Sequence, residues 1–170
     1  MMKNIMLAIT VLAVVYLAAC TKPQHNPSPD PTSIPTPQPI TTSNVREDVE
    51  IKDLVENFGK RLQTVSLLAP DAAQELQRQY TEFVSPTLLE MWMYDVSKAP
   101  GRMVSSPWPD RIEITSLTRE APNRYVINGL VIEITSSELV SGGAANKIPV
   151  QIVVEREQGP WLITQYSEQH

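Results

Sequence analysis

The chain has 170 residues, 42% of them hydrophobic, and a formal net charge of −5. Its basic residues are scattered, with no run beyond Lys60–Arg61, so it lacks the basic stripe that nucleic-acid binding requires. The single cysteine excludes an internal disulfide and a cysteine zinc site, and His25 and His170 lie outside the predicted core. We therefore expect no Ser-His-Asp triad, no metal, no cofactor and no nucleic-acid partner.

The first 19 residues are typical of a signal peptide. Lys3 supplies a positive charge near the start, and Ile5–Tyr16 form an apolar stretch of about 12 residues. The small residues Ala18 and Ala19 follow this stretch. A stretch of that length is shorter than the roughly 20 residues that cross a bilayer comfortably. We therefore predict that residues 1–19 direct export and are removed.

The sequence Leu17-Ala18-Ala19-Cys20 resembles the lipobox of bacterial lipoproteins. In that family the cysteine thiol receives a diacylglyceryl group, and cleavage occurs just before the cysteine. Each buried methylene contributes about 0.8 kcal/mol, so two or more acyl chains anchor a protein firmly. The resemblance implies lipidation of Cys20 and a place on the extracytoplasmic face of the cell membrane. The alternative is an ordinary secretory signal followed by an incidental cysteine.

Residues 20–46 are predicted to be the lipidated cysteine and a proline-rich tether. Prolines alternate with other residues along 27–31 and 35–39, which favours polyproline II and removes backbone donors. At ~3.1 Å per residue, such a spacer could reach roughly 80 Å. Proline-rich segments also bind aromatic grooves, so a ligand role for this segment is the alternative.

From Glu47 the composition is globular, and residues 47–170 are predicted to form one domain. Apolar residues at helical spacing predict a first helix over 47–66. Pro70 and Asp71 are suited to the start of a second helix. Ser85-Pro86 is typical of an N-cap followed by proline at the first helical position, which predicts a third helix ending near Asp95.

Residues 97–110 contain three prolines and one glycine, which predicts a long irregular loop. After this loop the apolar residues alternate with a period of two, as in strands. The predicted strands begin at Ile112 and then cover about 126–134, 148–154 and 161–166. Gly129 is a candidate β-bulge, and 136–146 is predicted to be a long hairpin loop.

Helices followed by antiparallel strands predict an α+β fold, with the helix over 47–66 covering one face of the sheet. The order of elements over 47–168 and the strand Gly159-Pro160-Trp161-Leu162-Ile163 resemble the NTF2-like (cystatin-like cone) superfamily. Residues 106–114 also resemble uncharacterised lipoproteins of Gram-positive bacteria. The superfamily resemblance implies N-terminal helices packed on a curved antiparallel sheet, with a pocket between them. Its members include enzymes such as ketosteroid isomerase and also binding or dimerisation modules.

The candidate ligand-binding residues are Trp108, Arg102, Asp110 and Arg111. Prolines flank Trp108 on both sides, so we expect it either at a pocket rim or as a plug between the third helix and the sheet. The guanidiniums of Arg102 and Arg111 could hold a carboxylate or phosphate. The structural alternative is an ion pair between Asp110 and one of the two arginines.

Two further groups of residues could carry function. Trp92, Tyr94 and Trp161 could wall an apolar or sugar-like pocket, although Trp92 and Trp161 also fit apolar core faces. An isomerase-like reaction would need a buried carboxylate with a raised pKa opposite a hydrogen-bond donor. The candidates for such a pair are Asp95 and Asp110 with Tyr80, Tyr94 and Tyr125, although both acids lie at the ends of predicted elements. We assign no catalytic residue.

The sequence therefore predicts a lipid-anchored envelope protein whose domain is a non-enzymatic binding or interaction module. Its partner would be an unknown protein or small molecule, and homodimerisation is left open. The alternative is a small isomerase or hydrolase on the cone fold. An open cavity with a buried carboxylate would favour the enzyme, whereas an interior filled by side chains would favour the module.

Overall fold

The computed structural model describes residues 42–169, and the side chains of 44–169. The predicted signal peptide, Cys20 and residues 21–41 of the predicted tether lie outside the described residues. The first helix, α1, covers Thr42–Arg61. Residues 42–46, which we predicted to be tether, are therefore helical.

One stripe of α1 faces the core, and Ile51, Val55 and Phe58 on it are fully buried. A short 3-10 helix, η1 (Leu62–Thr64), continues α1. Two nine-residue helices follow, α2 (Ala72–Tyr80) and α3 (Pro86–Tyr94), and then a second 3-10 helix, η2 (Val96–Lys98). The predicted N-cap of α3 is confirmed, because Ser85 Oγ accepts a hydrogen bond from the Leu88 N–H at 3.3 Å.

Four antiparallel strands form one sheet in the order β1-β2-β3-β4. They are β1 (Trp108–Ala121), β2 (Arg124–Ile134), β3 (Asn146–Glu155) and β4 (Leu162–Glu168). Gly129 pairs with Ile114 and the next pair is Asn128 with Ser116, so the bulge lies at Thr115 on β1 and opposite Gly129. A Cβ at Gly129 would lie 2.8 Å from the Glu113 carbonyl oxygen, which explains the glycine.

The predicted hairpin loop 136–146 contains a short helix, α4 (Ser136–Ser141), that our sequence analysis missed. Its capping box is local: Ser137 donates its N–H to Thr135 Oγ1, and the Glu138 carboxylate accepts the Thr135 N–H at 2.8 Å. The Thr-x-x-Glu spacing of this box is visible in the sequence and could have revealed the helix.

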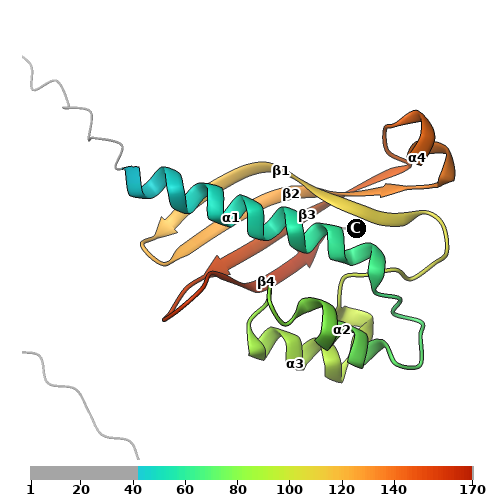
Figure 1. Ribbon diagram of the computed structural model, residues 1–170, viewed down its shortest axis with the longest axis horizontal. Coiled ribbons are helices and arrows are strands. Elements are labelled where there is room, and N and C mark those ends of the chain that lie inside the picture. The colour runs from blue at the N-terminus through green and yellow to red at the C-terminus, as the bar shows by residue number, and fades with distance from the viewer. Residues whose placement is uncertain (1–41, 170) are drawn as a thin grey trace, which may run out of the picture. The chain divides into compact units, whose positions relative to one another are not determined.

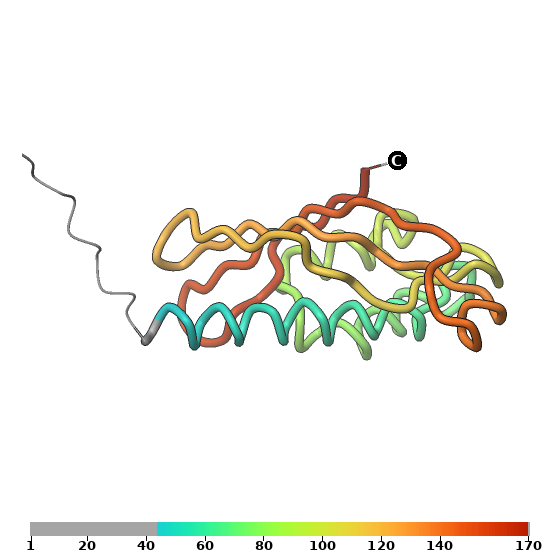
Figure 2. The backbone as a smooth tube through the Cα atoms, turned by 90° about the horizontal axis from the view of Figure 1, so that it is seen from above, coloured from blue at the N-terminus to red at the C-terminus, as the bar shows by residue number. Residues whose placement is uncertain are grey.

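Helix α1 lies across the sheet beside β1, while α2 and α3 pack against each other next to β4 (Figures 1 and 2). Gly59 allows the close approach of α1, since a Cβ there would lie 2.6 Å from the backbone nitrogen of Ile112. The turn between α2 and α3 covers the edge of β4, where Ser85 donates to the Ile163 carbonyl at 2.8 Å and Ile163 donates to that of Phe83 at 2.9 Å. The predicted α+β class, with helices on an antiparallel sheet, is confirmed.

Candidate functional site

Aromatic side chains fill the space between the helices and the sheet. The Phe58 ring centroid lies 5.0 Å from that of Tyr80, 6.4 Å from that of Trp92 and 6.0 Å from that of Tyr166. Phe83 packs on the same ring at 6.1 Å. Trp92 is thus a core residue. The rings occupy the region in which the resemblance implied a pocket.

The tyrosine hydroxyls of this aromatic core are engaged as hydrogen-bond donors. Tyr80 donates to the Pro100 carbonyl at 2.7 Å, and Tyr166 donates to Glu168 Oε1 at 2.6 Å. Burial raises the pKa of both hydroxyls above the ordinary value for tyrosine, and the charge of Glu168 adds to this effect. Both tyrosines therefore remain protonated at neutral pH. Their hydrogen bonds link the aromatic core to the Pro100 carbonyl and to the Glu168 carboxylate.

The candidate acids lie outside this aromatic core. Asp95 caps η2, and hydrogen bonds from Ser97, followed by the one from Lys98, lower its pKa. This shift is opposite to the one that the isomerase-like reaction needs. Asp110 forms an ion pair with Arg111 at 2.7 Å. Tyr94, a candidate donor, is 94% exposed.

The prediction that Trp108 is a plug is wrong. Trp108 is the first residue of β1 and is the cross-strand partner of Ile134, so the two side chains share one face of the sheet. Neither residue belongs to the core cluster formed with the helices. Trp108 is partly exposed and does not enter the space beside α3. Strand pairing decides its direction, and the flanking prolines alone could not reveal that pairing.

The structure brings together two of the three predicted charged residues. Arg111 contacts Asp110 at 2.7 Å and Glu113 at 2.6 Å, so the predicted structural ion pair is present with a second acid. The contacts of Arg102 are with other residues than these. Its backbone pairs with residues 65–67, and its Nε is buried without a hydrogen-bond partner among the described residues. The three side chains do not form the shared anion site that we considered.

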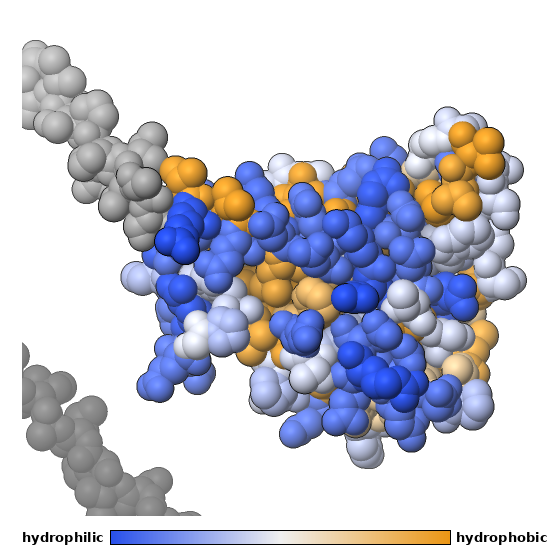
Figure 3. All heavy atoms as spheres, viewed as in Figure 1, coloured by the Kyte–Doolittle hydropathy of each residue, from blue (hydrophilic) through white to orange (hydrophobic). Residues whose placement is uncertain are grey.

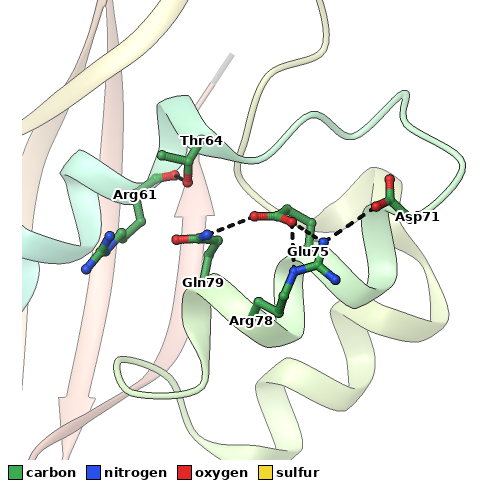
Figure 4. A network of polar contacts seen from close by, with 6 residues as sticks. All are labelled: Arg61, Thr64, Asp71, Glu75, Arg78 and Gln79. Carbon is green, nitrogen blue, oxygen red and sulfur yellow. Dashed lines mark hydrogen bonds and ion pairs between the residues drawn. The ribbon is translucent and has the colours of Figure 1, made fainter.

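A second charged group lies on the surface of α2. Arg78 contacts Glu75 and reaches Asp71 at 3.5 Å, while Gln79 donates to Glu75 at 2.8 Å (Figure 4). The hydrogen bond from Arg78 is the main reason why the pKa of Glu75 is lowered. These residues come from α2 and the turn before it, so the network supports the helix start, where Asp71 makes no side-chain cap.

One polar hollow of about 340 Å³ lies between the start of α3 and the β3–β4 hairpin, and Ser85, Glu155 and Thr164 are among its lining residues. A hydrogen bond from Thr164 and then one from Arg124 lower the pKa of Glu155, which is therefore ionised and already partnered. Among the described residues we find no cluster of three acidic, histidine or cysteine side chains that could hold a metal. No helix in that part of the chain has the length and apolarity needed to cross a membrane.

The near end of the domain, where α1 begins, carries a polar and aromatic cluster that our sequence analysis missed. Glu47 of α1 lies between two arginines, 3.2 Å from Arg119 and 2.8 Å from Arg156. Each guanidinium lies over a ring: Arg119 over Tyr125 at 5.7 Å and Arg156 over Trp161 at 4.3 Å. The residues come from α1, the β1–β2 hairpin and the β3–β4 hairpin, so no local sequence signal joins them.

The far end of the domain, opposite the start of α1, carries exposed apolar side chains. The loop after α1, the loop before β1 and helix α4 all reach this end (Figures 1 and 2). We define the far-end surface by its exposed apolar residues, Leu68, Met103, Val104, Leu139 and Val140. Val140 is 89% exposed and Leu139 69%, and apolar side chains gather over α4 in Figure 3. Sequence analysis treated this region only as loops.

Comparisons with known proteins add two distant structural likenesses. No protein family matches the chain, and no curated protein matches it. The intermembrane space region of the chloroplast protein ARC6 is 16% identical, with 72% of this chain and 94% of that one covered and a TM-score of 0.40. A designed protein whose name carries NTF2 is 14% identical, with 75% and 98% covered and a TM-score of 0.36. The class of the protein, a helix layer on a four-stranded antiparallel sheet, therefore rests on its own elements.

Proposed function

We propose that the protein is a lipid-anchored lipoprotein of the cell envelope, whose domain binds a partner protein on the extracytoplasmic side of the membrane. The lipobox-like sequence ending at Cys20 and the proline-rich segment after it support the anchoring. We further propose that the domain is a distant, closed form of the NTF2-like cone. The order of three helices followed by antiparallel strands supports this assignment.

The observation that carries the binding role is the contrast between a filled interior and an apolar exterior. Rings occupy the space between α1–α3 and the sheet, which favours recognition at the surface. The far-end surface exposes five large apolar side chains on α4 and two neighbouring loops. Covering such side chains with a partner gains roughly 25 cal/mol per Å² of apolar area. The domain would thus present this surface away from the point where the chain enters it.

Anchoring is tested by changing the cysteine. In cells supplied with labelled palmitate, Cys20→Ser should abolish incorporation and leave a precursor that the lipoprotein pathway does not process. Thr21→Ser is the matched control and should be labelled like the wild type. Equal labelling of wild type and Cys20→Ser would refute lipid anchoring at this residue.

The binding surface is tested separately in whole cells. A photo-crosslinking amino acid at Val140 should give a discrete crosslinked product, whereas one at the exposed Lys52 on α1 should not. A product of twice the monomer mass would identify the partner as a second copy. If the two positions give the same crosslinks, or if Val140 gives none, the far-end surface is not the binding site.

A further inference from the structure

The first two turns of α1 are attached to the domain through polar side chains. The first fully buried residue of the helix is Ile51, and Val45 and Val49 before it are each 53% exposed. Glu47 makes ion pairs with Arg119 and Arg156, and Asn44 accepts a hydrogen bond from Arg119. Because residues 44–50 bury no apolar side chain fully, these contacts decide whether the segment stays on the sheet.

The sheet itself holds the two arginines in position. Arg119 donates to the carbonyl oxygen of Ala121, the last residue of its own strand, at 3.3 Å and to that of Pro122, in the turn that follows, at 2.8 Å. Arg156 lies over the Trp161 ring, 4.3 Å from its centroid. Neither arrangement uses α1. The two guanidiniums would therefore stay converged if the start of α1 left, and such preorganised pairs suit carboxylates.

Two buried aromatic side chains beside these ion pairs carry polar atoms that make no hydrogen bond among the described residues. Trp161 is 2% exposed and Tyr125 0%, and their rings pack edge to face at 5.3 Å. The indole Nε1 and the Tyr125 hydroxyl are buried without a hydrogen-bond partner among the described residues, and Glu47 Oε2 has its ion pair with Arg119 at 3.2 Å but no hydrogen bond there. Burial, followed by the nearby Asp48 carboxylate, raises the pKa of Tyr125 to about 12, so its hydroxyl remains a donor. Unpartnered buried groups are rare in native proteins, and the contacts of Glu47 leave the Trp161 Nε1 and the Tyr125 hydroxyl without a hydrogen bond.

We propose that Arg119 and Arg156 form a carboxylate-binding site that Glu47 occupies in the unbound domain. A carboxylate of an acidic polypeptide displaces Glu47, and residues 42–50 then leave the sheet and unfold. Each released residue lengthens from about 1.5 Å in the helix to about 3.1 Å in extended chain, so the segment preceding the domain gains roughly 14 Å of reach. This site is separate from the far-end surface, so the proposal goes beyond the proposed function and does not depend on it.

The first test asks whether an external carboxylate can replace that of Glu47. The full chain in detergent is melted in sodium acetate and in sodium chloride at equal ionic strength. Acetate should raise the Tm of Glu47→Ala by at least ~3 °C over chloride and do so saturably. Wild type, the exposed control Glu50→Ala and the double variant Glu47→Ala/Arg156→Ala should show no such difference. An equal acetate effect in all four proteins, or none in Glu47→Ala, would overturn the proposal.

The second test asks whether displacement releases the helix start. Amide exchange of the wild-type full chain is followed by mass spectrometry with and without a penta-glutamate peptide. The peptide should speed exchange in residues 42–50 by about tenfold or more and leave residues 55–61 unchanged. The near-isosteric Glu47→Gln should show fast exchange there without peptide. Unchanged exchange with the peptide, or an equal effect of inorganic phosphate, would overturn the assignment of a polypeptide carboxylate site.

Discussion

The two ends of the domain differ in which side chains they carry and in how far these are covered. At the near end, charged and aromatic side chains from α1 and two hairpins converge, and the Glu47 carboxylate lies between two guanidiniums. At the far end, α4 and two loops leave apolar side chains in solvent, from Met103 at 49% to Val140 at 89% exposed. At the near end the charged groups are thus paired within the domain, although Val45 and Val49 are each 53% exposed there. At the far end the more exposed Leu139 and Val140 are covered only if another molecule binds, and their burial would then stabilise the complex.

This difference between the two ends predicts that the free energy of unfolding depends more on side chains of the near end than on exposed ones. Trp161→Ala should destabilise the domain by about 3 kcal/mol, at the lower limit for a buried tryptophan, because the change also removes an unpartnered Nε1. The matched control Tyr94→Ala, at an aromatic that is 94% exposed, should change the free energy of unfolding by less than about 0.5 kcal/mol. Denaturant titration measures both. Equal costs for the two variants would remove the basis of the comparison.

Trp108 should give an intermediate effect, since it is partly exposed and packs beside Ile134 at the start of β1. Truncation to alanine should cost about 1–2 kcal/mol, between the values expected for a buried and a free aromatic. The urea midpoints of Trp108→Ala and of the wild type measure this change in the free energy of unfolding. A cost above about 3 kcal/mol would contradict the partial exposure of Trp108 and show that it is fully buried on its face of the sheet.

A side chain at the near end, Glu155, should also contribute to the loss of folding stability at low pH. Hydrogen bonds from Thr164 and Arg124 lower the pKa of Glu155 in the folded state, so its contribution is complete above the ordinary glutamate pKa. That contribution is lost as the pH falls through the lowered folded value. It is worth at most about 1 kcal/mol, because the Arg124–Glu155 pair is partly exposed. Melting curves from pH 7 to pH 3 should therefore fall less steeply for Glu155→Gln. Parallel curves would show that Glu155 does not contribute.

The smallest effect on stability should come from the far end. Leu139→Asp combined with Val140→Asp should shift the free energy of unfolding by less than about 0.5 kcal/mol, since both side chains are already in solvent. The same variant should lose the crosslinked product formed at the far-end surface, here probed through Val104. Strong destabilisation would show that these side chains serve the fold, and retention of the product would place the binding site elsewhere.

Local patterns in the sequence sufficed for the class of fold and for the order of α1–α3 and of the four strands. The Ser85-Pro86 start of α3 and the change of apolar period after residue 110 depend on neighbours a few residues apart, which fix backbone conformation directly. The Thr135–Glu138 capping box was equally readable, although α4 went unpredicted. The four strands, and α1 as the helix that covers the sheet, were predicted from the same local spacing of apolar residues.

Only the tertiary structure decided which of these residues meet. Phe58, Trp92 and Tyr166 fill one space from three elements, and Glu47 reaches Arg156 across 109 positions of the chain. The helix starts at Thr42 where composition still indicated tether, and distant contacts from the sheet to Asn44 and Glu47 hold this start in place. Trp108 faces away from the core because strand register, set by the whole β1–β2 ladder, fixes its direction. Contacts of this kind depend on the path of the chain through space, which no pattern of a few neighbouring residues encodes.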